Sequence, residues 1–160
     1  MNNVIKIALV EDNKNDQVLA LRAFQKAGLS NEITVLDDGV EAIEFFIGDD
    51  SHPPVADFSA SYLILLDLKL PRLDGLEVLR RLRAHPRWKM AQIVILTASL
   101  EERDRIAGYG LGANSYILKP VDFDQFSEVI RQVGYYWLIL NKPPPANQAP
   151  APEPALAEVQ

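Results

Sequence analysis

The sequence contains no cysteine among its 160 residues. This excludes disulfide bonds, zinc sites built on thiolates and cysteine nucleophiles, and it is compatible with a reducing compartment. The chain also lacks any continuous apolar run of about 18 residues, so we expect no membrane-spanning segment and no membrane partner. Residues 1–4 do not begin the basic and then apolar pattern of a signal peptide, and the sequence therefore predicts a cytoplasmic location.

Positive charge is in short supply. The chain has 16 Lys and Arg residues against 22 Asp and Glu, a formal net charge of -6, which argues against nucleic acid as a partner. The hydrophobic and charged fractions, 48% and 24%, are typical of a soluble globular protein. The length suits one domain with a substantial core but hardly two.

Apolar stretches and helical patterns alternate along the chain. Strands are predicted at 4–10, 33–36, 62–66, 93–96 and 115–118. Helices are predicted at about 14–27, from Asp38, before Pro86, near 100–109 and from Asp122. Five such units in strict alternation predict an α/β fold, a doubly wound parallel sheet with helices on both faces.

The end of the chain differs in composition from the rest. Six of the eleven prolines lie in residues 143–160, interleaved with alanines. A segment with so few apolar side chains cannot bury enough surface to fold on its own. We therefore expect one domain over residues 1–142 and a disordered or extended tail over residues 143–160.

Four of the predicted strands end in residues that carry chemistry. The first ends in Glu11 and Asp12, the third in Asp67, the fourth in Thr97 and the fifth in Lys119. A parallel sheet brings these strand ends to one edge, where open α/β folds place their sites. The edge would hold three carboxylates, one hydroxyl and one ammonium.

This set of groups points to phosphoryl transfer. Clustered carboxylates repel one another unless a cation compensates them, and an all-oxygen site with room for water suits Mg²⁺. An aspartate can act as the nucleophile and become an acyl phosphate, while the metal and an adjacent lysine neutralise the transferring group. A threonine hydroxyl can then donate to a phosphoryl oxygen.

These motifs resemble the receiver domain of two-component response regulators. The matching segments, in order, are Val10-Glu11-Asp12, Leu66-Asp67-Leu68 with Pro71 and Asp74-Gly75, Leu96-Thr97-Ala98, Gly112-Ala113, and Tyr116 with Lys119-Pro120. The resemblance covers residues 4 to about 134. It implies a flavodoxin-like fold with five helices and strand order 2-1-3-4-5. In that family the Lys119-Pro120 peptide bond is often cis.

The resemblance also implies a role for each site residue. Asp67 would accept a phosphoryl group from a sensor histidine kinase, with Lys119 contacting that group. Glu11, Asp12, Asp67 and the backbone carbonyl of Lys69 would bind Mg²⁺. Thr97 and Tyr116 would form the conformational switch, although Tyr116 could equally be an ordinary, partly buried tyrosine. The side chain of Lys69 could lean over the site or face solvent.

A closer resemblance is to the small response regulators paired with bacterial and cyanobacterial phytochromes, which lack an output domain. It implies a cytoplasmic signalling protein that is not an enzyme beyond its own phosphorylation and dephosphorylation, with a phytochrome-type kinase as its partner. The last helix continues into an aromatic and aliphatic segment, which suggests a partner surface. We expect a homodimer through the helix near 100–109, the strand 115–118 and the last helix, with contacts from Tyr136, Trp137, Ile139 and Leu140.

Three other functions conflict with particular residues. A phosphatase of the haloacid dehalogenase type needs a second acid two residues after its nucleophile, where this chain has Lys69. A pseudo-receiver that only binds partners would be expected to lack Asp12, Asp67 or Lys119, and all three are present. A flavin protein needs a phosphate-binding turn after the first strand, where acids stand instead. Outside the site, we expect His52 and His85 to be bystanders and the arginines at 80, 81 and 83 to form a solvated helix face.

Overall fold

The structure, a computed structural model, describes residues 4–146. Strands and helices alternate along it, as the sequence predicts. In chain order they are β1 (Ile5–Val10), α1 (Lys14–Lys26), β2 (Ile33–Leu36), α2 (Gly39–Phe46), β3 (Ser61–Leu66), α3 (Gly75–Ala84), β4 (Gln92–Thr97), α4 (Glu102–Gly110), β5 (Ser115–Leu118) and α5 (Phe123–Gly134). A turn of π-helix, η1 (Tyr135–Leu140), follows α5 directly.

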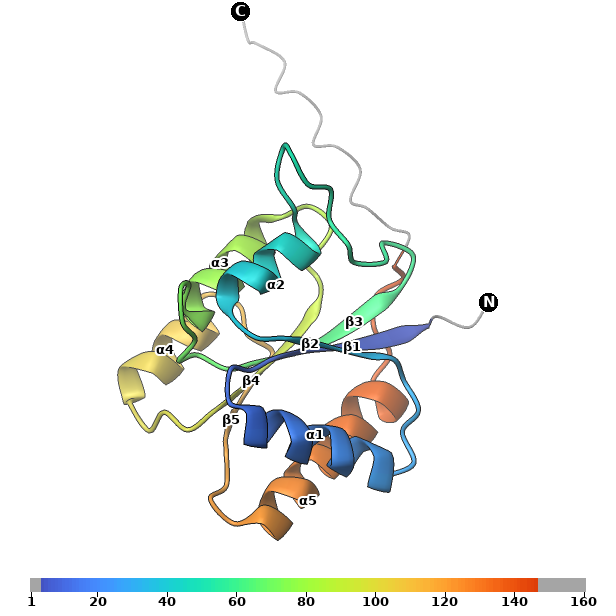
Figure 1. Ribbon diagram of the computed structural model, residues 1–160, viewed down its shortest axis with the longest axis vertical. Helices are drawn as coiled ribbons and strands as arrows, with labels where there is room; N and C mark the ends of the chain where they lie inside the picture. The colour runs from blue at the N-terminus through green and yellow to red at the C-terminus, as the bar shows by residue number, and fades with distance from the viewer. Residues whose placement is uncertain (1–3, 147–160) are drawn as a thin grey trace, which may run out of the picture.

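The five strands form one parallel sheet in the order β2-β1-β3-β4-β5, which confirms the predicted fold class. Helices α1 and α5 cover one face of the sheet, and α2, α3 and α4 lie over the other (Figure 1). Because both faces are covered, the central strands are buried throughout, including all six residues of β3 and all six of β4. This burial is the physical reason for their unbroken apolar sequence.

Alternate side chains of β3 enter two separate cores. Tyr62, Ile64 and Leu66 pack beneath α2 and α3. Leu63 and Leu65 pack against α1 and α5 on the other face. A one-residue shift in register would exchange these two sets, so the pairing of β3 with β1 and β4 is strongly specified. The sheet is thereby a rigid platform for the residues at its edge.

Side-chain caps start four of the helices soon after a strand ends. In each case the capping oxygen accepts the backbone N–H three residues later. The caps are Asn13, Asp38, Asp74 and Asp122. Helix α4 has no side-chain cap, because Glu101 precedes it without such a bond.

The last helix does not continue as one regular helix. It passes at Gly134 into η1, a change that the hydrophobic pattern does not predict. Gly134 packs closely on the α1 side, since a Cβ there would overlap the Leu29 side chain and lie 3.3 Å from Phe24. Trp137 and Leu138 pack partly on the core beneath α1 and α5.

Residues 143–146 return to the edge of the sheet at which the strands begin. There they line a groove together with β3, β4 and the segment between α3 and β4. Ala146 is buried in this position, with 8% of its surface exposed. The rest of the tail for which disorder is predicted, residues 147–160, lies outside the described residues.

Two further expectations concern the backbone. Residues 4–146 contain no cis peptide bond, so the Lys119-Pro120 bond is trans and the cis form implied by the resemblance is absent. Within the same range, no helix combines the length and apolar character that crossing a lipid bilayer requires.

Arg83 was wrongly predicted to belong to a solvated helix face. Its guanidinium is half-buried and donates to the carbonyl oxygens of Gly112 (2.8 Å), Lys89 (3.1 Å) and Ala91 (2.6 Å) and to Asn114 Oδ1 (2.9 Å). Separate loops thus depend on one planar group with five donors.

We expect Arg83→Met to lower the free energy of unfolding by about 1.5–3 kcal/mol, because it leaves these acceptors without their charged donor. Urea denaturation followed by circular dichroism measures the change. Arg80→Met is the matched control: Arg80 lies on the same helix and pairs with Glu77 at the surface. The control should change stability by no more than about 0.5 kcal/mol. Equal losses in the two variants would contradict a special role for Arg83.

Candidate functional site

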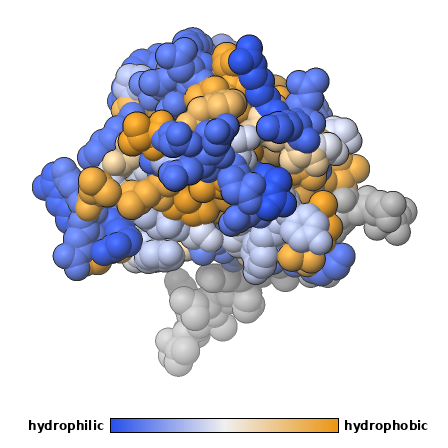
Figure 2. All heavy atoms as spheres, turned by 90° about the horizontal axis from the view of Figure 1, so that it is seen from below, coloured by the Kyte–Doolittle hydropathy of each residue, from blue (hydrophilic) through white to orange (hydrophobic). Residues whose placement is uncertain are grey.

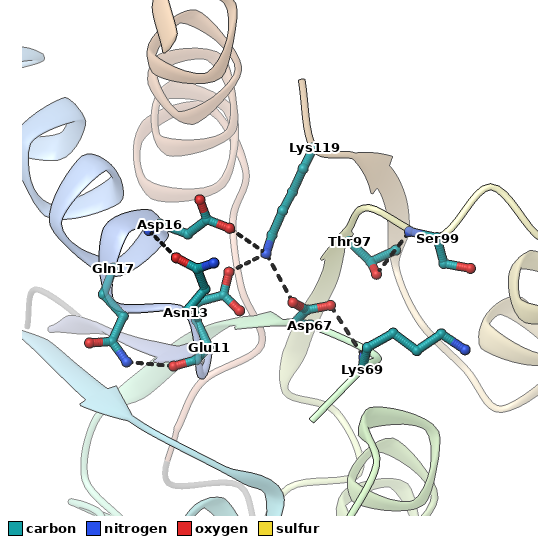
Figure 3. Close-up of polar contacts among 9 residues, drawn as sticks. All are labelled: Glu11, Asn13, Asp16, Gln17, Asp67, Lys69, Thr97, Ser99 and Lys119. Atoms are coloured by element: carbon teal, nitrogen blue, oxygen red, sulfur yellow. Dashed lines mark hydrogen bonds and ion pairs between the residues drawn. The ribbon is translucent and has the colours of Figure 1, made fainter. Parts of the chain in front are cut away.

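Four strand ends meet at the edge of the sheet where the strands finish (Figure 3). Glu11 and Asp67 directly follow β1 and β3, Thr97 is the last residue of β4, and Lys119 follows β5. A backbone hydrogen bond of 2.8 Å from the Lys119 N–H to the Thr97 carbonyl extends the β4–β5 pairing into the site. The juxtaposition predicted from the order of strands is therefore present.

The backbone around Asp67 is held by the start of α3. The Gly75 N–H donates to the carbonyl of Leu68 at 2.8 Å. A Cβ at Gly75 would overlap the carbonyl oxygen of Asp67 and lie 2.7 Å from Cα of Leu68, so no other residue fits without moving the backbone. Asp74 and Gly75 are the cap and the first residue of α3 rather than a separate turn, and the glycine is needed for this close approach. The close approach also fixes the position from which the Asp67 carboxylate projects.

The Lys119 ammonium lies at the centre of the site. It is 2.9 Å from Oδ2 of Asp67 and 2.9 Å from Oδ2 of Asp16, and it also bonds Oε1 of Glu11. Only 10% of the Lys119 side chain is exposed. Although burial alone would lower the pKa of Lys119, the surrounding carboxylates raise it well above its ordinary value. The ammonium is therefore a permanent positive charge beside Asp67.

The two buried acids differ in their affinity for protons. Burial and the neighbouring Asp67 carboxylate raise the pKa of Glu11 to about 8. Burial also disfavours the charged form of Asp67, but the adjacent Glu11 carboxyl and the Lys119 charge outweigh this and hold the pKa of Asp67 below its ordinary value. Asp67 is thus the acid that stays ionised, as a nucleophile must.

Glu11, Asp12 and Asp67 form a suitable donor set for a divalent cation. One carboxylate oxygen from each lies within 4.8 Å of the others. Oε2 of Glu11 is buried without a hydrogen-bond partner, and such an orphaned oxygen calls for a cation or a proton. Asp12 is exposed, which leaves the position open to water, as Mg²⁺ prefers. The part of the Lys69 carbonyl in this set stays a prediction.

Thr97 and Tyr116 both contact the loop between β4 and α4. The Thr97 side chain is fully buried, and its hydroxyl oxygen accepts the Ser99 N–H at 3.3 Å. The Tyr116 hydroxyl donates to the Ser99 carbonyl at 3.1 Å, and its half-buried ring packs on the core beneath α2 and α3. Both residues thus meet at Ser99, which the sequence pattern did not single out.

Sequence reasoning also missed Asp16 and Asp104. Asp16 contacts Lys119, and Asp104 lies 3.2 Å from Lys69. Each lies in the first turn of a helix that follows a strand end. An acid in that place can point at the same edge as the strand ends, and this signal could have found both residues.

The residues predicted for a dimer contact lie elsewhere, on η1. Tyr136, Ile139 and Leu140 are about half-exposed, whereas Trp137 is more buried. Because α5 begins at the edge that holds Asp67 and runs back along the sheet, η1 lies toward the opposite edge (Figure 1). The residues predicted for the dimer contact are therefore separate from the strand-end residues around Asp67.

Comparison with known proteins identifies the family of this chain. A sequence model of the response regulator receiver domain matches residues 7–131. The chain belongs to the response regulator receiver family. Receiver domains accept a phosphoryl group in two-component signalling.

Known receivers resemble this chain over most of their length. The response regulator Rcp1 of Synechocystis is 34% identical over 82% of this chain and 88% of its own. Its solved structure in a Mn²⁺-bound form has a TM-score of 0.76, covering 88% of this chain and 98% of the other at 32% identity. The phosphorylated cyanobacterial phytochrome response regulator RcpA has a TM-score of 0.75 at 31% identity, covering 89% and 99%. A probable methanogenesis regulatory protein of Methanothrix harundinacea, FilR2, is 33% identical over 86% of each chain.

The raised pKa of Glu11 makes the stability of this receiver depend on pH when divalent cations are absent. Folded Glu11 keeps its proton up to about pH 8, whereas in the unfolded chain it releases it near the ordinary value of 4.5. The folded state therefore binds more protons between these values, and stability falls as pH rises. With EDTA present, we expect the Tm to drop by roughly 2 to 5 °C between pH 6.5 and 8.5 relative to Glu11→Gln.

Differential scanning fluorimetry measures this difference. Adding Mg²⁺ should raise the Tm more at pH 8.5 than at pH 6.5, because at the lower pH the cation must displace the proton that Glu11 holds. Glu11→Gln cannot titrate, and subtracting its profile removes the contribution of other groups. A wild-type profile parallel to that of Glu11→Gln would show that Glu11 does not hold this proton.

Proposed function

We propose that this chain is a single-domain response regulator that accepts a phosphoryl group on Asp67 from a phosphohistidine of a sensor histidine kinase. The observation that carries the proposal is the ion pair of 2.9 Å between Asp67 Oδ2 and Lys119 Nζ in a nearly buried site. An ionised aspartate beside a fixed ammonium has both the nucleophile and the counter-charge that phosphoryl transfer needs.

In the transfer, a carboxylate oxygen of Asp67 attacks phosphorus. The O–P bond forms as the N–P bond to the kinase histidine breaks, and the imidazole leaves with the electron pair. Lys119 neutralises charge on the phosphoryl oxygens. Glu11, Asp12, Asp67 and the Lys69 carbonyl would hold Mg²⁺, which offsets the remaining negative charge when bound. Water later hydrolyses the acyl phosphate, so the chain acts only on its own phosphoryl group.

Thr97 and Tyr116 are the proposed switch. The Thr97 hydroxyl lies at the end of β4 and would donate to a phosphoryl oxygen on Asp67. Its oxygen now accepts the Ser99 N–H, so this movement would change the loop to which Tyr116 is bonded. The loop continues into α4, and the change can therefore reach the surface made by α4, β5 and α5.

The kinase is proposed to be of the phytochrome type, as in the phytochrome regulators that this chain resembles. A cytoplasmic location is proposed on the same resemblance. The haloacid dehalogenase alternative has no support in the site, because Lys69 stands where that reaction needs an acid.

A homodimer through α4, β5, α5 and η1 is the proposed assembly. Large hydrophobic side chains are exposed on these elements at Ile106, Tyr109, Leu118, Ile139 and Leu140. A groove lined by residues of β5, α5 and η1 lies among them. Figure 2 looks onto the molecule from below Figure 1, the side that α1 and α5 cover, and shows hydrophobic patches between hydrophilic side chains. Apolar surface of this extent favours an interface.

Phosphorylation tests the central proposal. Wild-type protein incubated with acetyl phosphate and Mg²⁺ should gain one phosphoryl group by intact mass, and Asp67→Asn should gain none. Asp74→Asn is the matched control, since Asp74 is a nearby helix cap whose amide replacement can still accept the Glu77 N–H. EDTA should abolish the gain. A phosphorylated Asp67→Asn, or a folded wild type that gains nothing, would refute Asp67 as acceptor.

Substitution on η1 tests the dimer. The double variant Ile139→Glu, Leu140→Glu should lower the mass seen by light scattering to that of the monomer, because it places two charges from each copy in a symmetric interface. Val55→Glu is the control, as Val55 is 74% exposed on the loop before β3. Trp137 is left intact, since it packs on the core. A mass unchanged in the η1 variant would remove η1 from the interface.

A further inference from the structure

The Lys69 side chain extends away from Asp67 and toward the loop before α4 (Figure 3). Its ammonium lies 3.2 Å from Oδ2 of Asp104. Only the backbone of Lys69 contacts the Asp67 carboxylate: the Lys69 N–H donates to Asp67 Oδ1 at 3.3 Å. The residue thus has its backbone at the phosphorylation site and its charge on α4.

Asp104 is the fixed partner of this pair. Its side chain is 10% exposed, against 62% for that of Lys69. The Ser99 hydroxyl donates to the same oxygen, Oδ2, at 2.6 Å. The Ser99 hydroxyl and the Lys69 ammonium together hold the pKa of Asp104 below its ordinary value, and Arg103 adds to this at longer range. The carboxylate is therefore ionised and anchored to the loop.

Ser99 joins this ion pair to both proposed switch residues. Its N–H bonds the Thr97 hydroxyl oxygen, its carbonyl accepts from Tyr116, and its hydroxyl bonds Asp104. Every polar group of Ser99 is thus engaged by a residue of the switch or by the partner of Lys69. A change at Asp104 can reach Thr97 and Tyr116 through one residue.

The Lys69 ammonium is poised for exchange. An ion pair with one exposed member is weak, because water screens it and the long side chain must be ordered. A phosphoryl group on Asp67 carries a charge of about −1.5 to −2. It would be attached to the carboxylate that the Lys69 backbone already contacts, within range of a flexible four-carbon side chain. The stronger anion would then compete with Asp104 for the same ammonium.

We propose that Lys69 is a phosphorylation-sensitive tether: Asp104 holds its ammonium in the unmodified protein, and a phosphoryl group on Asp67 draws it away and releases the Ser99 loop. The inference rests on the proposed phosphorylation of Asp67 and adds a second connection to α4 beside the Thr97–Tyr116 switch. Because such coupling is reciprocal, Asp104 weakens phosphoryl binding by retaining Lys69.

Beryllofluoride with Mg²⁺ is the probe, because it mimics the phosphoryl group and binds reversibly. Its affinity for the full chain is measured by titration of the Ser99 backbone amide signal in nitrogen-15 NMR spectra. Asp104→Asn keeps an acceptor for the Ser99 hydroxyl and loses only the charge. We expect this variant to bind beryllofluoride about twofold to fivefold more tightly than wild type.

Two further variants separate the tether from other effects. In a chain that already carries Lys69→Gln, adding Asp104→Asn should bring no gain in affinity. The single Lys69→Gln variant and the double variant should therefore bind beryllofluoride equally. Glu102→Gln removes an exposed acid from the same turn of α4 and should leave the affinity at the wild-type value.

Distinct results would overturn the two proposals. Equal affinities for Asp104→Asn and Glu102→Gln, or a gain that persists in the Lys69→Gln background, would refute the tether while leaving phosphorylation of Asp67 intact. If Asp104→Asn does not fold, the Lys69→Gln variant alone decides. A beryllofluoride-induced shift of the Ser99 signal that is the same in wild type and in Lys69→Gln would also refute the tether. A wild type that does not bind beryllofluoride would overturn the proposed function and the tether with it.

Discussion

One buried ammonium organises the candidate site. Lys119 balances the carboxylates of Glu11, Asp16 and Asp67, which come from two strand ends and the first turn of a helix. Without it, three acids would share a water-poor edge at a high electrostatic cost. With it, one positive charge still faces three acids, and burial together with the neighbouring Asp67 carboxylate raises the pKa of Glu11. The residual negative charge attracts a cation, and the same ammonium can meet a phosphoryl group.

The sheet makes this arrangement possible because it is rigid on both faces. Two separate cores hold β3 from above and below, so its end cannot shift without disrupting packing. Gly75 then brings the start of α3 against the backbone at Asp67. The parts that move in the proposed switch are side chains and the loop at Ser99. A stiff platform with one adjustable loop is suited to converting a local charge into a change at the surface.

Much of this could be predicted from the chain, for identifiable reasons. Continuous apolar runs such as that before Asp67 identify buried parallel strands, and parallel strands place Glu11, Asp67, Thr97 and Lys119 at one edge. What could not be predicted depends on side-chain direction. Arg83 has the sequence surroundings of a solvated arginine, yet its donors reach separate loops. Asp16 and Asp104 could have been placed near the strand ends from their position in a first helical turn, but the lysine that each contacts follows only from the fold.

The two ends of the described chain share one edge of the sheet. The Val4 carbonyl accepts the N–H of Ser61 at the start of β3, and Ser61 also lines the groove where residues 143–146 lie. Asp67 follows the other end of the same strand. A fluorophore or affinity handle attached at either position would therefore be separated from the acceptor by the full length of β3. The edge that holds Asp67, the proposed acceptor, would stay clear of such a label, so labelled protein could report on the proposed phosphotransfer.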